Sequence, residues 1–84
     1  MKTLFEKYEA AKKETDAIEA EMKNDFFSEE LEARFDESYK KEFAAFMELA
    51  NAIVKFTNGK VDAKTARAMI QTRFEDVKAL LANV

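Results

Sequence analysis

The stretch "FTNGKVDAKTA", residues 56–66, marks the clearest boundary between two helices in this chain. Gly59 is the only glycine and proline is absent, so Asn58-Gly59 is the one strong stop signal in 84 residues. Glycine adopts the left-handed conformation that ends helices at little cost, and Asp62 can accept hydrogen bonds from the free amides of a following helix. The stretch therefore predicts that one helix ends near residue 57 and that another begins near residue 63.

The residues before this boundary carry a wide apolar face at helical spacing. It consists of Leu31, Phe35, Tyr39, Phe43, Phe46, Leu49, Ala50, Ile53 and Phe56. At 100° per residue these side chains spread over roughly 140°, which is enough to contact two neighbouring helices. Residues 29–57 are therefore the expected central helix, and residues 63–82 are expected to form one further helix against it.

The first part of the chain has a narrower apolar seam. Its members are separated by alternating steps of four and three residues: Leu4, Tyr8, Ala11, Thr15, Ile18 and Met22. Such a seam is typical of a helix that packs along a single groove. A helix over about residues 2–23 is predicted.

The stretch "KNDFFSEEL", residues 23–31, connects the first two predicted helices. Ser28 followed by two glutamates is typical of a helix start, because the hydroxyl caps amides and acids favour the positive end of the helix dipole. Phe26 and Phe27 can plug the end of a bundle here, or they can form a docking patch for a partner. A helix that continues without interruption would instead make the chain a long helical hairpin.

These patterns predict an all-α fold in a single domain over residues 1–84. The expected architecture is an antiparallel three-helix bundle, with helices at about 2–23, 29–57 and 63–82, because the connections are short. A long helical hairpin is the alternative. Cysteine and histidine are absent, so disulfides are impossible and the usual soft metal ligands are missing.

The charge is unevenly distributed along the chain, whose formal net charge is −3. Residues 1–48 carry 14 acidic and 8 basic residues, net −6, whereas residues 49–84 carry 3 acidic and 6 basic residues, net +3. Either the basic last helix lies against the acidic remainder, or one end faces a charged partner. No apolar run resembles a signal peptide or a membrane span, so a cytoplasmic location is expected.

Two charged residues fall on predicted apolar faces. Arg73 lies within the apolar face of the last helix, and Glu42 lies within that of the central helix. An unpaired charge there would be costly. Three interpretations remain open: a Glu42–Arg73 ion pair that fixes helix register, side chains that reach the rim, or a binding hot spot.

A basic stripe lies on the other face of the last predicted helix. It comprises Lys60, Lys64, Arg67, Gln71 and Lys78. The stripe can be a solvated surface, a contact for an acidic protein, or a nucleic-acid surface that contacts phosphates. The overall acidity of the chain disfavours nucleic acid.

The sequence predicts a protein without catalytic activity, cofactor or metal. The commonest general base and the strongest nucleophile, His and Cys, are missing, and one glycine cannot build a phosphate-binding loop. The leading hypothesis is a small acidic interaction module, an inhibitor or an adaptor, of the composition common among phage and mobile-element accessory proteins. A self-assembling structural helix protein is the alternative, and a nucleic-acid binder is the second alternative. No motif matches a known family.

Overall fold

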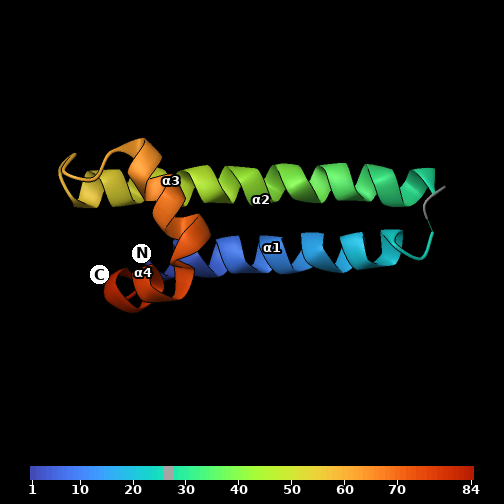
Figure 1. Cartoon of the computed structure of the whole chain (residues 1–84), viewed down its shortest axis with the longest axis horizontal. Coiled ribbons are helices and arrows are strands. Elements are labelled where there is room, and N and C mark those ends of the chain that lie inside the picture. The colour runs from blue at the N-terminus through green and yellow to red at the C-terminus, as the bar shows by residue number, and fades with distance from the viewer. Residues whose placement is uncertain (26–27) are drawn as a thin grey trace.

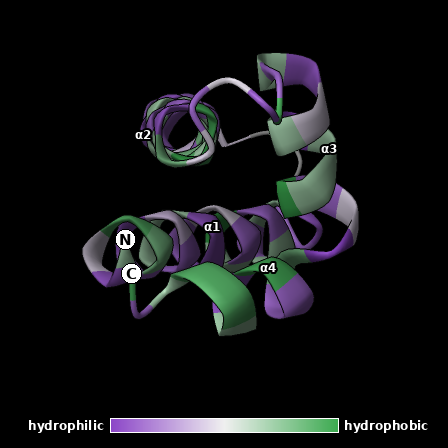
Figure 2. Ribbon diagram, turned by 90° about the vertical axis from the view of Figure 1, so that its left-hand side faces the viewer, coloured by the Kyte–Doolittle hydropathy of each residue, from purple (hydrophilic) through white to green (hydrophobic). Residues whose placement is uncertain are grey.

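The computed structural model describes residues 1–25 and 28–84, and these residues form four helices and no strand. The helices are α1 (Lys2–Met22), α2 (Glu29–Phe56), α3 (Ala63–Thr72) and α4 (Phe74–Leu81). As Figure 1 shows, α1 and α2 run antiparallel as a long hairpin, and α3 and α4 lie at one end of it. Figure 2 shows α3 bridging from α2 towards α4, which lies beside α1. The all-helical class is confirmed.

The arrangement corrects the prediction of one helix over residues 63–82. The chain breaks at Arg73, whose backbone (φ −135°, ψ 39°) leaves the helical region, so the last segment forms two short helices. The break lets the Phe74 ring pack against Phe5 and Tyr8 of α1, at centroid distances of 5.8 and 5.5 Å. A straight helix packed on α2 would not reach α1 in this way. The three-helix bundle is therefore replaced by a hairpin with two short helices at one end.

The turn between α2 and α3 forms as its residues predict. Asn58 (φ 55°) and Gly59 (φ 81°) both adopt left-handed conformations. The Gly59 amide donates to the Val54 carbonyl at 3.0 Å, which closes a Schellman turn at the end of α2. The Asp62 carboxylate then accepts from the Thr65 amide at 2.7 Å and caps α3.

The connection between α1 and α2 is described on both sides of residues 26–27. α1 ends at Met22, and α2 begins after Ser28, whose hydroxyl accepts from the Leu31 amide at 3.2 Å. Because α1 and α2 run antiparallel, no single helix continues through this stretch. The interpretations of Phe26 and Phe27 as an end plug or as a docking patch lie outside the described residues.

The apolar core lies at the end of the hairpin where α3 and α4 pack, which we call the covered half. Phe5 is fully buried there (0% exposed), although it stands beside the predicted α1 seam rather than on it. The side chains of this core come from each of the helices described: Phe5, Tyr8, Ala45, Phe46, Leu49, Ala50, Ile53, Ala66, Ile70 and Val77. The core therefore depends on the break at Arg73, which brings α4 onto α1.

The other end of the hairpin, residues 12–22 and 29–43, is the open half, where α1 and α2 extend beyond α3 and α4 (Figure 1). Its buried positions include a polar pair, in which the Thr15 and Ser38 hydroxyl oxygens lie 2.8 Å apart. Thr15 donates its own hydrogen to the Ala11 carbonyl at 2.9 Å, so Ser38 is the donor within the pair. The bond is made only when these two residues face each other, and it therefore favours one register of α1 on α2.

Candidate functional site

Apolar side chains follow one line along α2 in the open half. Leu31, Phe35, Tyr39 and Phe43 recur every four residues, and we call them the α2 row. The Tyr39 and Phe43 side chains remain 51% and 53% exposed, whereas the other two are half-buried. Phe35 and Tyr39 stack at a centroid distance of 6.1 Å with 21° between their ring planes. The apolar face of α2 was predicted to contact two neighbouring helices. The second neighbour, α3, packs on α2 in the covered half and does not lie along this row.

The α2 row ends beside a small hollow where α1, α2 and α3 meet. The hollow has a volume of about 120 Å³ and is lined by Tyr8, Tyr39, Glu42, Phe43, Phe46 and Gln71. Burial raises the pKa of the Glu42 carboxyl above its ordinary value, and Lys12 opposes this effect. Burial also raises the pKa of the Tyr8 phenol, and the Glu42 carboxylate adds to it. The hollow is therefore an aromatic pocket with one ionisable carboxyl group, suited to the end of an inserted side chain.

Glu42 and Arg73 do not form an ion pair in the described part of the chain. Arg73 is exposed at the junction of α3 and α4, while Glu42 is half-buried in the small hollow where α1, α2 and α3 meet. The predicted pairing assumed a continuous last helix in register with α2. The break at Arg73 removes that register.

The predicted basic stripe is divided between two helices. Lys64, Arg67 and Gln71 share one face of α3 because they are spaced by three and four residues. Lys60 is exposed in the turn before α3. Lys78 lies on α4 instead, where its ammonium is 2.6 Å from the Glu9 carboxylate of α1. That contact raises the pKa of Lys78, so this lysine serves the α1–α4 contact.

One face of α3 meets the end of the α2 row through Gln71. Gln71 lines the hollow together with Tyr39 and Phe43, and Lys64 and Arg67 lie on the same face of α3 as Gln71. Lys64 is exposed and Arg67 is half-buried, and neither is within ion-pair distance of an acid in the described residues. We call Lys64 and Arg67 the basic edge of α3. Gln71 thus joins the end of the α2 row to the face of α3 that carries the basic edge.

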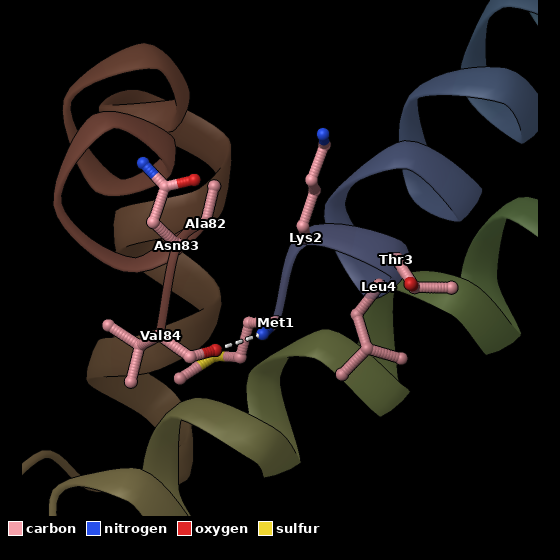
Figure 3. A pocket seen from close by; sticks show the side chains of 7 residues that line it. All are labelled: Met1, Lys2, Thr3, Leu4, Ala82, Asn83 and Val84. Atoms are coloured by element: carbon pink, nitrogen blue, oxygen red, sulfur yellow. Dashed lines mark hydrogen bonds between the residues drawn. The ribbon is translucent and has the colours of Figure 1, made fainter.

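A larger hollow of about 590 Å³ lies at the two ends of the chain (Figure 3). Its lining comes from the first and last residues: Met1, Lys2, Thr3, Leu4, Ala82, Asn83 and Val84. The Met1 ammonium donates to the Val84 carbonyl, and the labelled Lys2 side chain points away from this bond (Figure 3). The lining residues do not direct several polar groups to one point, so this hollow is a weaker candidate than the surface around the α2 row.

Several kinds of site are not found within residues 1–25 and 28–84. No helix in these ranges is long and apolar enough to cross a membrane. The same residues contain no group of three or more potential metal ligands placed to hold an ion. Comparisons with protein families, with curated proteins and with solved structures find no match to this chain.

Sequence reasoning assigned Tyr39 and Phe43 to the core and chose other residues as candidate contacts. The four-residue spacing of the α2 row could have predicted that part of the row is exposed. Each step of four residues rotates by 40°, so the row moves around α2 and away from a neighbour that runs parallel to the axis. A row that drifts in this way cannot remain under α1 along its whole length.

Proposed function

We propose that this chain is a small non-enzymatic protein-interaction module whose docking surface is the α2 row with its adjoining hollow. The observation that carries the proposal is the exposure of Tyr39 and Phe43, at 51% and 53%, beside a hollow that can take a side chain. Aromatic residues are enriched where proteins bind one another, because a rigid ring contributes a large contact area at low entropic cost. Contiguous exposed apolar surface of this kind is typical of interaction sites.

The chemistry of the hollow supports binding rather than catalysis. Its polar groups are two phenols, one amide and the Glu42 carboxyl, and the chain contains no histidine or cysteine. A nucleophile would need an activating base within hydrogen-bond reach, and no hydrogen bond joins the Glu42 carboxyl to either phenol in the described residues. An inhibitor would use the surface to cover a partner's site, whereas an adaptor would use it to hold a partner beside another protein.

Binding to nucleic acid has less support than binding to protein. The pairing of Lys78 with Glu9 leaves Lys60, Lys64 and Arg67 as the cations of the predicted stripe around α3. Three phosphate contacts give weak, salt-sensitive association. The exposed rings beside these cations favour a protein partner that is apolar along its centre and charged at its edge.

The proposal is tested by retention of proteins from native cell extract on the immobilised full chain. Wild type is compared with the variant Tyr39→Lys, Phe43→Lys, which places two charges on the docking surface. We expect the variant to retain bound protein at least about 10-fold less, because buried aromatic contacts dominate such interfaces.

The matched control is Glu30→Lys, Glu37→Lys, which also adds two lysines to α2. At 100° per residue both positions point away from Tyr39, and Glu37 lines the opposite side of the hairpin with Arg34 and Lys41. The control should retain protein as wild type does, and circular dichroism should show both variants folded. Equal retention by wild type and by the Tyr39, Phe43 variant would contradict the proposal.

A further inference from the structure

We propose that the partner at the α2 row is a second copy of this chain, lying antiparallel across a two-fold axis that crosses the α2 row midway between Phe35 and Tyr39, at the level of residue 37. This inference rests on the proposed docking function of the α2 row and names its occupant. Cyclic dimers of this type are the commonest closed assemblies, and they require a surface that is complementary to itself.

The spacing of the α2 row makes it complementary to itself. Its four members lie symmetrically about position 37, with Phe35 and Tyr39 two residues away and Leu31 and Phe43 six residues away. A two-fold axis at this level sets Leu31 against Phe43 of the second copy and Phe35 against Tyr39 of the second copy. Each apolar side chain of the row thereby meets another, over a contact about 18 Å long at 1.5 Å per residue.

The charges at the two ends of this surface are also complementary. Glu29 and Glu32 are exposed at the start of α2, and we call them the acidic tip. The same two-fold axis brings them to the level of residues 45 and 42 of the second copy. Gln71 lies there, beside Glu42 and Phe43, and the basic edge of α3 shares the face of Gln71. Arg67 and Lys64 lie one and two turns before Gln71 on the same face of α3, so the acidic tip of each copy faces the side of α3 that carries the basic edge of the other.

This charge arrangement selects the antiparallel orientation. A parallel pair would place the acidic tip of one copy against the acidic tip of the other, and like charges across an interface oppose association. The arrangement also gives a use to the uneven charge of the chain, net −6 over residues 1–48 and net +3 over residues 49–84. The basic residues of α3 are then matched by acids of the second copy.

The exposed area is consistent with a missing partner of this size. The chain exposes 6055 Å², whereas a compact monomer of 9.7 kDa exposes about 5,100 Å². The excess of about 950 Å² is comparable to the roughly 800 Å² that each partner contributes to an interface of standard size. The radius of gyration is 14.6 Å, against about 12 Å for a compact chain of this length. Two overlapping open halves would complete a four-helix bundle.

The first test is the mass of the intact chain by sedimentation over a concentration series from about 1 µM to about 1 mM. We expect the mass to rise from 9.7 kDa to twice that value as concentration increases. The variant Tyr39→Lys, Phe43→Lys should dissociate at least about 100-fold more readily, and the control Glu30→Lys, Glu37→Lys should match wild type. A wild-type chain that stays monomeric throughout, or a dimer that the Tyr39, Phe43 variant leaves intact, would overturn the inference.

The second test exchanges the charges of the two contacts. One variant makes the basic edge acidic (Lys64→Glu, Arg67→Glu), and the other makes the acidic tip basic (Glu29→Lys, Glu32→Lys). Each alone places like charges in both contacts of its own dimer, so each should remain monomeric where wild type is dimeric. An equal mixture restores opposite charges in both contacts and should form a dimer containing one copy of each. A mixture that stays monomeric while wild type dimerises would overturn the proposed pairing.

These outcomes separate this inference from the proposed function. If wild type is monomeric but retains another protein through Tyr39 and Phe43, the second copy is the wrong occupant and the docking surface stands. If wild type is monomeric and retains no protein through these two residues, both proposals fail.

Discussion

The covered and open halves of the hairpin share the same two helices but differ in what holds them together. In the covered half, α3 and α4 add apolar residues, so that Phe5, Leu49 and Ile53 are each 0% exposed. In the open half, the contact between α1 and α2 includes the Thr15–Ser38 hydrogen bond, and Tyr39 and Phe43 remain about half exposed. Burial of apolar surface is the dominant favourable term in folding. The difference indicates that burial of apolar surface stabilises the covered half more than the open half.

The largest expected effect is the loss of stability on truncating Phe5 in the covered half, compared with truncating Phe43 in the open half. Phe5→Ala removes a fully buried ring that contacts Phe74, and we expect it to lower the free energy of unfolding by about 3–5 kcal/mol. Phe43→Ala removes a ring that is 53% exposed, so we expect a loss below about 1.5 kcal/mol. Urea unfolding of both variants measures the difference, at a concentration where the chain is monomeric. Equal losses would show that the two halves are equally stabilised by burial.

The helix boundaries were predictable because they depend on neighbouring residues. Ser28 and Asp62 each cap the helix that follows, and Asn58-Gly59 ends α2, all through hydrogen bonds that span at most five residues. Predicted starts at 2, 29 and 63 match the observed starts of α1, α2 and α3. Local hydrogen-bonding chemistry is visible in a sequence because its partners are adjacent in the chain.

The break at Arg73 was not predictable because its cause is distant in sequence. Neither glycine nor proline marks it, and the local stretch Gln71-Thr72-Arg73 is compatible with a continuous helix. The Thr72 hydroxyl donates to the Ala68 carbonyl at 2.7 Å, an interaction that often bends helices, but Thr15 makes the same bond to Ala11 within an unbroken helix. The contact of Phe74 with α1 provides the tertiary reason for the break.

The candidate site was predictable in its composition but not in its exposure. The apolar face of α2 follows from helical spacing, and all four residues of the α2 row belong to it. Whether another helix covers a given part of that face depends on the direction of α3, which bridges from α2 towards α4 and does not run along α2 (Figure 2). That direction goes with the distant contact of Phe74 with α1, so the exposure of Tyr39 and Phe43 could not be predicted from local sequence.

The next largest effect tests the polar pair of the open half. Thr15→Val leaves the buried Ser38 hydroxyl without its acceptor and should lower the free energy of unfolding by about 1–3 kcal/mol. Thr15→Val with Ser38→Ala removes both hydroxyls and should recover most of that loss, because no unpaired polar group then remains. Urea unfolding of the single and double variants forms the comparison. A double variant no more stable than Thr15→Val would show that the hydroxyls stabilise the open half outright.

A smaller effect is expected at the junction of the covered half. Arg73 is exposed and is not within ion-pair distance of any acid in the described ranges, so Arg73→Ala should change the free energy of unfolding by less than ~0.5 kcal/mol. Its neighbour Phe74 is half-buried against two rings of α1, and Phe74→Ala should cost about 2 kcal/mol. Thermal unfolding of both variants gives the test. A loss of several kcal/mol for Arg73→Ala would instead indicate that Arg73 forms a buried ion pair with Glu42.

The smallest effect concerns Glu42, where the two halves meet. Burial raises the pKa of this carboxyl in the folded chain above its value in the unfolded chain, so the folded state holds the proton more tightly. The favourable contribution of Glu42 to the free energy of unfolding is therefore present at low pH, and it is lost as pH rises through the raised pKa of the folded chain. Glu42→Gln, which mimics the neutral form, should be more stable than wild type at pH 7 and equal to it at about pH 3.

The size of that difference is limited by solvent, because Glu42 is only half-buried and lies near Lys12. We expect less than ~0.5 kcal/mol at pH 7, measured as the difference between two urea unfolding curves. Glu37→Gln on the opposite side of the hairpin controls for the loss of one negative charge. A Glu42→Gln variant that is less stable than wild type at pH 7 would mean that attraction to Lys12 outweighs burial. The hollow would then hold a stable carboxylate, and a cation rather than an apolar side chain would be its better occupant.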